Sequence, residues 1–96
     1  MTKIVHCKKE PYDVYIGRPS PWGNPYRIGP DGTRDEVIKK YEEHVRRDAW
    51  LMAALPSLAG KTLGCWCHPK PCHGEVLIKI LKEMRLEETD ANEGNT

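Results

Sequence analysis

The sequence predicts an α/β domain, a small single-layer sheet of short strands with two main helices packed on it. Short segments rich in β-branched residues alternate along the chain with longer segments of helical periodicity. The 96 residues are too few for more than one hydrophobic core. We therefore expect one domain over residues 1–86. The polar, acidic segment 87–96 has no apolar anchors and is expected to be a disordered tail.

Two short strands are expected before the first helix. Residues 3–7 and 13–16 have the β-branched content of strands. Between residues 17 and 32, four prolines and four glycines interrupt regular structure, so this segment is predicted to be a long loop. Its aromatic residues Trp22 and Tyr26 indicate an ordered loop, because large rings usually find a surface to bury against.

The first helix is predicted to begin at Thr33, where Thr-Arg-Asp-Glu forms a capping box with Glu36. Apolar residues then recur at helical spacing while charged residues take the other faces, so one amphipathic helix should reach about Leu55. Pro56 is expected to end it, and Trp50 is expected in the core. The apolar positions are Ile38, Tyr41, Val45, Ala49 and Met52.

A third strand is predicted over residues 61–66, and a second helix from near Cys72 to about Leu86. Segment 65–74 joins the two and holds three cysteines and two histidines. Open α/β sheets present their ligand sites where strands end and helices begin. This segment is therefore the leading candidate for a functional site.

The charge of the chain is unevenly distributed. The whole chain has a formal charge of +1, but the first 86 residues hold 15 basic and 10 acidic side chains, a net charge of +5. Such a surface could attract phosphate-bearing partners. A surplus of this size is also common on proteins that bind no nucleic acid.

Composition also bears on the compartment. No stretch approaches the ~20 apolar residues of a membrane span, and the N-terminus turns polar at Lys8 and Lys9 before a signal-peptide apolar region develops. We therefore expect a cytoplasmic protein with no membrane partner. Its four cysteines are expected to be reduced thiols used for packing, metal binding or reactivity. The sequence indicates no oligomeric state.

The first interpretation of segment 65–74 is a metal site. Cys65, Cys67 and Cys72, with His68 or His73 as fourth ligand, offer the thiolate and imidazole groups that suit zinc. Three thiolates also suit an iron–sulfur cluster with one outside ligand. The spacing is not a common zinc-finger pattern, and the adjacent Cys72 and His73 are expected to reach one ion only with difficulty. Zinc is thus a candidate cofactor that the sequence alone does not fix.

The second interpretation makes Cys72 a catalytic thiolate. A thiol at a helix N-terminus can have its pKa lowered, and His73 would then transfer protons. The exposed amides of the same turn, helped by Gly74 and Lys70, would hold a phosphate or carboxylate. Glu75 offers these amides a simpler partner as a capping carboxylate. In a third interpretation the cysteines only fill a buried strand and a tight turn.

The loop over residues 17–32 offers groups that recognise a nucleotide. Arg18 and the Ser20 hydroxyl would contact a phosphate, Trp22 or Tyr26 would stack on a base, and Asn24 would bind a base edge. A structural alternative is equally concrete. In it Trp22 fills the core, Asn24 caps a turn, and Arg18 pairs with an acid such as Asp13.

Two motifs carry a resemblance to a known family. They are Tyr15-Ile16-Gly17-Arg18-Pro19-Ser20 with Trp22-Gly23-Asn24-Pro25, and Leu63-Gly64-Cys65-Trp66-Cys67 with Pro69, Cys72-His73-Gly74 and Leu77. Up to about residue 82 the chain resembles domain of unknown function 4326, small proteins of bacteria and tailed bacteriophages. The resemblance implies a bacteriophage origin but no activity. A weaker likeness, to a Rossmann-like family whose helix starts with Cys-His-Arg, implies a fold of Rossmann-like character; here Gly74 replaces the arginine.

The interpretations combine into one expected function. The loop over residues 18–26 and the turn over 65–74 converge on a pocket that binds a phosphate-bearing ligand, a nucleotide or nucleic acid. Its enzymatic form would be hydrolysis or group transfer. Two alternatives stay open: a binding module stabilised by zinc or an iron–sulfur cluster, without catalysis, and a small bacteriophage protein that binds a host protein or a signalling nucleotide.

Overall fold

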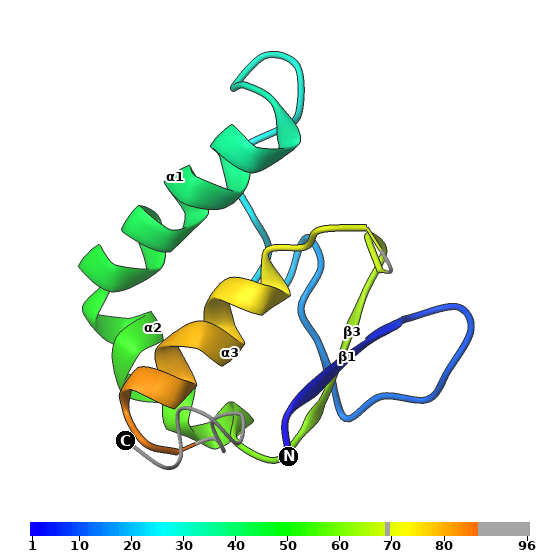
Figure 1. Ribbon diagram of the computed structural model, residues 1–96, viewed down its shortest axis with the longest axis vertical. Helices are drawn as coiled ribbons and strands as arrows, with labels where there is room; N and C mark the ends of the chain where they lie inside the picture. The colour runs from blue at the N-terminus through cyan, green and yellow to red at the C-terminus, as the bar shows by residue number, and fades with distance from the viewer. Residues whose placement is uncertain (69, 87–96) are drawn as a thin grey trace, which may run out of the picture.

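Three short parallel strands form the sheet of the computed structural model, which describes residues 1–68 and 70–86 (Figure 1). They are β1 (Lys3–His6), β2 (Val14–Tyr15) and β3 (Thr62–Cys65). β3 lies in the middle and pairs in parallel with both other strands, so the order is β1-β3-β2. The expected α/β class is confirmed, whereas the expected disordered tail lies outside the described residues.

The strand register places the carboxyl ends of the strands side by side. His6 at the end of β1 is opposite Cys65 at the end of β3, and the Cys7 amide donates to the Cys65 carbonyl at 3.0 Å. On the other edge Tyr15 is opposite Gly64. All three strands therefore deliver the residues that follow them to one end of the sheet.

The helix α1 (Arg34–Arg47) begins at the predicted capping box. Thr33 Oγ1 accepts a hydrogen bond from the Glu36 amide at 3.2 Å, and Glu36 Oε1 accepts one from the Thr33 amide at 2.8 Å. Each bond satisfies a donor that a helix start leaves without a helical partner. The buried face of α1 consists of Val37, Tyr41 and Val45.

The expectation of one continuous helix from Thr33 to about residue 55 is wrong, because the helix breaks at Asp48. This residue has extended backbone angles (φ −91°, ψ 107°), and its carboxylate accepts a hydrogen bond from the Leu51 amide at 3.0 Å. Asp48 thereby caps a second helix, α2 (Ala49–Ala54), because a short carboxylate competes with the helical backbone for that amide. A short 3₁₀ helix, η1 (Leu55–Leu58), follows.

The break also changes which side of the chain is buried. α2 buries Leu51 instead of Trp50, whose side chain is 61% exposed, so the expected place of Trp50 in the core is wrong. The helical register restarts after Asp48, which turns the following residues toward a different face. The Trp50 ring lies at the surface and contacts the Trp22 ring, with the ring centroids 6.3 Å apart.

The helix α3 (Gly74–Glu83) begins two residues later than predicted and ends three residues earlier. The Glu75 carboxylate accepts a hydrogen bond from the Cys72 amide at 2.9 Å, so it closes the helix start as a capping group. The buried face of α3 consists of Gly74, Val76, Leu77, Ile80 and Leu81.

The helices gather on one side of the strands, with α3 between α1 and the sheet (Figure 1). The core fills both interfaces and includes Leu63 of β3 and Tyr41 of α1. The Tyr41 hydroxyl donates to the Trp22 carbonyl at 2.7 Å, which ties the long loop to α1. Within the described residues, no helix is long and apolar enough to cross a membrane.

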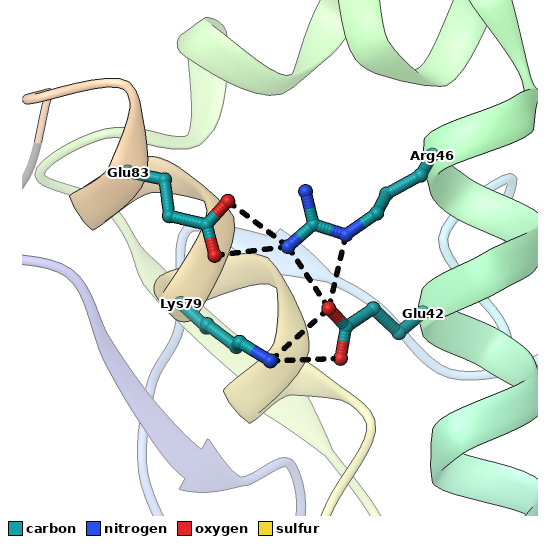
Figure 2. Close-up of polar contacts among 4 residues, drawn as sticks. All are labelled: Glu42, Arg46, Lys79 and Glu83. Carbon is teal, nitrogen blue, oxygen red and sulfur yellow. Dashed lines mark hydrogen bonds and ion pairs between the residues drawn. The ribbon is translucent and has the colours of Figure 1, made fainter.

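Four charged side chains also join α1 to α3 at the surface (Figure 2). Arg46 Nη2 lies 2.9 Å from a carboxylate oxygen of Glu42 and 2.9 Å from one of Glu83. Lys79 Nζ lies 3.1 Å from the other carboxylate oxygen of Glu42. These ion pairs connect the two helices at the surface, in addition to the apolar contacts between them.

Candidate metal centre and adjoining cavity

Four potential metal ligands meet at the end of the sheet. They are Cys65 at the end of β3, Cys67 in the turn after it, and Cys72 and His73 just before α3, and their ligand atoms all lie within 4.8 Å of one another. A tetrahedral zinc ion with bonds of about 2.0–2.3 Å would hold such atoms about 3.3–3.8 Å apart. Only small movements separate this arrangement from a coordinating one.

Backbone amides point at two of the sulfurs. The Cys67 amide donates to Cys65 Sγ at 3.2 Å, and the Gly74 amide donates to Cys72 Sγ at 3.3 Å. A hydrogen bond to the charged form of a group favours that form, so these amides suit thiolates that bind a cation. All four cysteines of the chain are free thiols.

The His73 ring has one nitrogen committed and one turned toward the sulfurs. Its Nε2 lies 2.7 Å from the Ile16 carbonyl oxygen, and because a carbonyl can only accept, Nε2 carries the proton. Nδ1 lies 3.7 Å from Cys72 Sγ, and in the neutral ring this nitrogen carries the lone pair that can bind a metal ion. A histidine that donates one nitrogen to a carbonyl and offers the other is the usual arrangement of a metal ligand.

The expected difficulty of bringing Cys72 and His73 to one ion does not arise. Cys72 and His73 lie just before the first residue of α3, and their ligand atoms are within 4.8 Å of each other and of the other two ligands. His68, the other histidine considered from sequence, does not belong to the group of ligand atoms.

The pKa values of the thiols differ in direction. A hydrogen bond from Cys65, followed by one from Cys72, holds the pKa of Cys67 below its usual range. The pKa of Cys72 is raised, first by its hydrogen bond to Cys65, whose Sγ lies 2.6 Å away, then by its bond to Cys67 and by burial. Cys72 is also buried, so its surroundings do not favour the free thiolate that was expected there.

A cavity of about 530 Å³ adjoins the four ligands. Cys65, Cys67 and His73 line it together with residues of the long loop and of α1. Three arginines line it, and none of its lining residues is acidic. No ion pair involves these arginines within residues 1–68 and 70–86. The arginines are Arg18, Arg27 and Arg34.

Arg18 and Asn24 are predicted ligand-binding residues that line the cavity, and so does Tyr26, the alternative stacking residue. Both ends of the Asn24 amide are used inside the chain: Oδ1 accepts from the Tyr26 amide at 2.9 Å, and Nδ2 donates to the Val37 carbonyl at 3.1 Å. Asn24 thus shapes the turn of the loop. Asp13, expected as an alternative partner of Arg18, instead accepts from a backbone amide of β3.

The other predicted ligand-binding residues do not line the cavity. Trp22 is 7% exposed and belongs to the core. Ser20 Oγ is buried with no hydrogen-bond partner among the described residues, and Lys70 is exposed. Gly74 is buried where a Cβ would lie 2.7 Å from Ile16 Cδ1, so it allows α3 to approach the sheet closely.

Arg27, Arg34 and Trp66 also line the cavity, and none of them was predicted to bind a ligand. Trp66 offered a signal, because a large aromatic residue stands between two candidate metal ligands in the sequence. Arg34 Nη1 donates to the Pro71 carbonyl at 3.2 Å, a contact 37 residues away that no local pattern reveals. Arg27 had no signal of its own.

Comparisons with known proteins agree with the chain's own motifs. A family model described as "Domain of unknown function (DUF4326)" matches residues 2–83. An "Uncharacterized 12.4 kDa protein in nrdA-td intergenic region" of Enterobacteria phage T4 is 33% identical over 89 residues, covering 88% of this chain and 81% of that protein. The "Uncharacterized protein R718" of Acanthamoeba polyphaga mimivirus is 33% identical over 98 residues, covering 83% and 75%. No solved structure matches significantly.

Proposed function

Since the chain belongs to DUF4326, a family defined without an activity, its function has to be argued from its own residues, and we propose that it is a zinc-binding domain. Cys65, Cys67, Cys72 and His73 would hold the ion. The observation that carries the proposal is the convergence of these four ligand atoms within 4.8 Å. Zinc bound there would join the end of β3 to the start of α3 and stabilise the fold.

The donor set favours zinc over other metals. Three thiolates and one imidazole are a common tetrahedral combination for zinc, whereas magnesium and calcium prefer oxygen ligands. An iron–sulfur cluster is a larger body than a single ion, and its ligands must be spread around it. The tight grouping of the four atoms therefore supports one ion.

Native mass spectrometry of protein supplied with zinc under reducing conditions tests this proposal. The native protein should carry one zinc ion that is lost on denaturation. Cys67→Ser should lose most of the bound zinc, because serine offers no thiolate. Cys7→Ser is the matched control, since Cys7 is another half-buried thiol but lies outside the ligand group, and it should keep the ion.

Removal of the ion provides a second measurement on the same proteins. A chelator should lower the melting temperature of the native protein and of Cys7→Ser, because an ion that binds only the folded state stabilises it by mass action. Cys67→Ser should show a much smaller shift. A native protein that takes up no zinc, or equal zinc loss in both variants, would contradict the metal centre.

The adjoining cavity supports a second function, the binding of a phosphate-bearing ligand. Three arginines without a carboxylate among the lining residues favour an anion, because guanidinium groups bind phosphate oxygens with two hydrogen bonds. We propose binding in place of hydrolysis or group transfer. Those reactions would need Cys72 and His73 as free catalytic groups, and the metal centre uses both.

Inorganic pyrophosphate is the probe for this second function, because it carries negative charge without any other recognition group. Isothermal titration calorimetry should detect its binding to the zinc-loaded protein. Arg18→Gln should weaken binding, whereas Arg47→Gln should not, because Arg47 is exposed on α1 outside this cavity. Absence of binding, or equal weakening by both substitutions, would count against an anion site.

A further inference from the structure

One large aromatic ring is exposed beside the arginines. Trp66 lies between the two proposed ligands Cys65 and Cys67, lines the cavity, and is 55% exposed. Most exposed side chains move freely, but this ring is held. Its Nε1 donates to the Tyr15 hydroxyl at 2.9 Å, and that hydroxyl donates to the Arg18 carbonyl at 2.9 Å.

Two further contacts fix the ring. The His6 ring meets it edge to face, with centroids 5.7 Å apart, and Lys8 Nζ lies 5.4 Å from its centroid. An exposed aromatic ring that is already immobilised loses little conformational entropy when a flat group stacks on it. The hydrogen-bond chain through Tyr15 also connects the ring to the backbone of Arg18.

We propose that the cavity binds a nucleoside phosphate, with the phosphate against the arginines and the base stacked on Trp66. This inference rests on the anion-binding function proposed above and names its ligand class. A phosphate and a planar ring in one small molecule match the two kinds of group that the cavity presents. Its volume of about 530 Å³ lies within the range of small-molecule sites, which run from about 300 to 1,000 Å³.

The proposed metal centre would hold the stacking ring in place. Cys65 and Cys67 flank Trp66 in sequence, so an ion bound by both thiolates fixes the backbone on each side of it. The zinc-loaded protein is therefore the form to test. Zinc content measured by native mass spectrometry accompanies every variant, so that loss of metal is not mistaken for loss of stacking.

Calorimetry with adenosine 5′-monophosphate, adenosine and inorganic phosphate tests the ligand class. The monophosphate should bind at least about 10-fold more tightly than either part alone. Trp66→Leu should weaken monophosphate binding on the order of 10-fold and leave pyrophosphate binding unchanged. Trp66→Phe keeps an aromatic face and should lose less. Trp50→Leu, which alters the other strongly exposed tryptophan, is the matched control and should change neither.

The outcomes distinguish failure of the nucleoside phosphate proposal from failure of the anion-binding function on which it rests. If inorganic phosphate binds as tightly as the monophosphate, or Trp66→Leu leaves the monophosphate affinity unchanged, the base contact is wrong. Continued pyrophosphate binding would then leave the anion site standing. If neither pyrophosphate nor adenosine 5′-monophosphate binds to the zinc-loaded protein, the anion site and the nucleoside phosphate site are both overturned, while the metal centre remains.

A nucleoside phosphate can be free or part of a single strand, and a further arm distinguishes the two sources. The zinc-loaded protein is titrated with thymidine 5′-monophosphate and with a decamer of deoxythymidine. Tighter binding of the decamer at equal nucleotide concentration assigns the site to a strand, because neighbouring phosphates add contacts. Equal or weaker binding assigns it to a free nucleotide, whose size suits a cavity of about 530 Å³.

Discussion

Gly74 is the residue that lets α3 approach the sheet and so brings Cys72 and His73 over the end of β3. A Cβ at this position would lie 2.7 Å from Ile16 Cδ1 and 3.0 Å from Ile4 Cδ1. Ile16 is fully buried in the core, so its terminal methyl group could make room only by shifting against other core side chains. The glycine therefore acts through close packing, and the ligand geometry depends on it.

Gly74→Ala is expected to destabilise the protein by a net of about 1–2 kcal/mol. Overpacking a tight core costs about 1–3 kcal/mol, which exceeds the gain of up to about 1 kcal/mol from replacing glycine in a helix. Urea unfolding of the zinc-loaded protein measures the difference. Lys39→Ala, at an exposed position of α1, is the control and should change stability by less than about 0.5 kcal/mol. If the stability of Gly74→Ala is unchanged or raised, the side chains of Ile16 and Ile4 can move enough to accommodate the added methyl group.

At the scale of elements, α1 and α3 are joined by the charged network of Figure 2. Its side chains are substantially exposed, so water and salt screen the attraction. The network also has a pH dependence. Hydrogen bonding from Lys79 holds the pKa of Glu42 below its usual range, so this carboxylate stabilises the folded state above its unfolded pKa. That contribution is lost as the pH falls through the lower, folded pKa.

Arg46→Ala is therefore expected to destabilise the protein by less than about 1 kcal/mol at neutral pH and low salt. The difference should shrink in about 1 M salt, and again as the pH falls through the lowered pKa of Glu42 and that carboxylate is protonated. Urea unfolding at several salt concentrations and pH values measures it.

Arg47→Ala serves as the control for Arg46→Ala, because Arg47 is the next exposed arginine of α1 and makes no ion pair within the described part of the chain. It should have a smaller effect that does not depend on salt. If both substitutions behave alike, the network contributes nothing specific to the packing of α1 on α3.

The two ends of α1 show what local sequence reveals and what it hides. The capping box of Thr33 and Glu36 was predicted and is confirmed, because both partners lie within four residues. The break at Asp48 was missed, because the apolar spacing continues past it. Aspartate is a favoured helix cap, so a signal was present, but the choice between capping and continuing depends on which apolar face the core accepts.

At the scale of the whole molecule, the proposed site combines residues that local patterns identify with others that only the fold brings near. The cysteines were candidates because of their type and place after a strand. The selection of His73 over His68 depends on the Ile16 carbonyl, which lies 57 residues away in sequence. Arg34 reaches the cavity only because the start of α1 lies beside the turn at Pro71. Contacts between residues this far apart leave no periodic pattern in the sequence, so they could not be predicted from it.

The strand order has a consequence for how the chain is made. β1 and β2 lie on opposite edges of the sheet, and each pairs with β3, which comes later in the sequence than both. As the chain leaves the ribosome from its N-terminus, the first 61 residues can form α1 and its capping box but none of these strand pairs. The sheet can assemble only once Thr62–Cys65 has emerged, and the proposed ligands follow within eight residues. Assembly of the sheet and completion of the proposed metal site therefore become possible at nearly the same stage of synthesis.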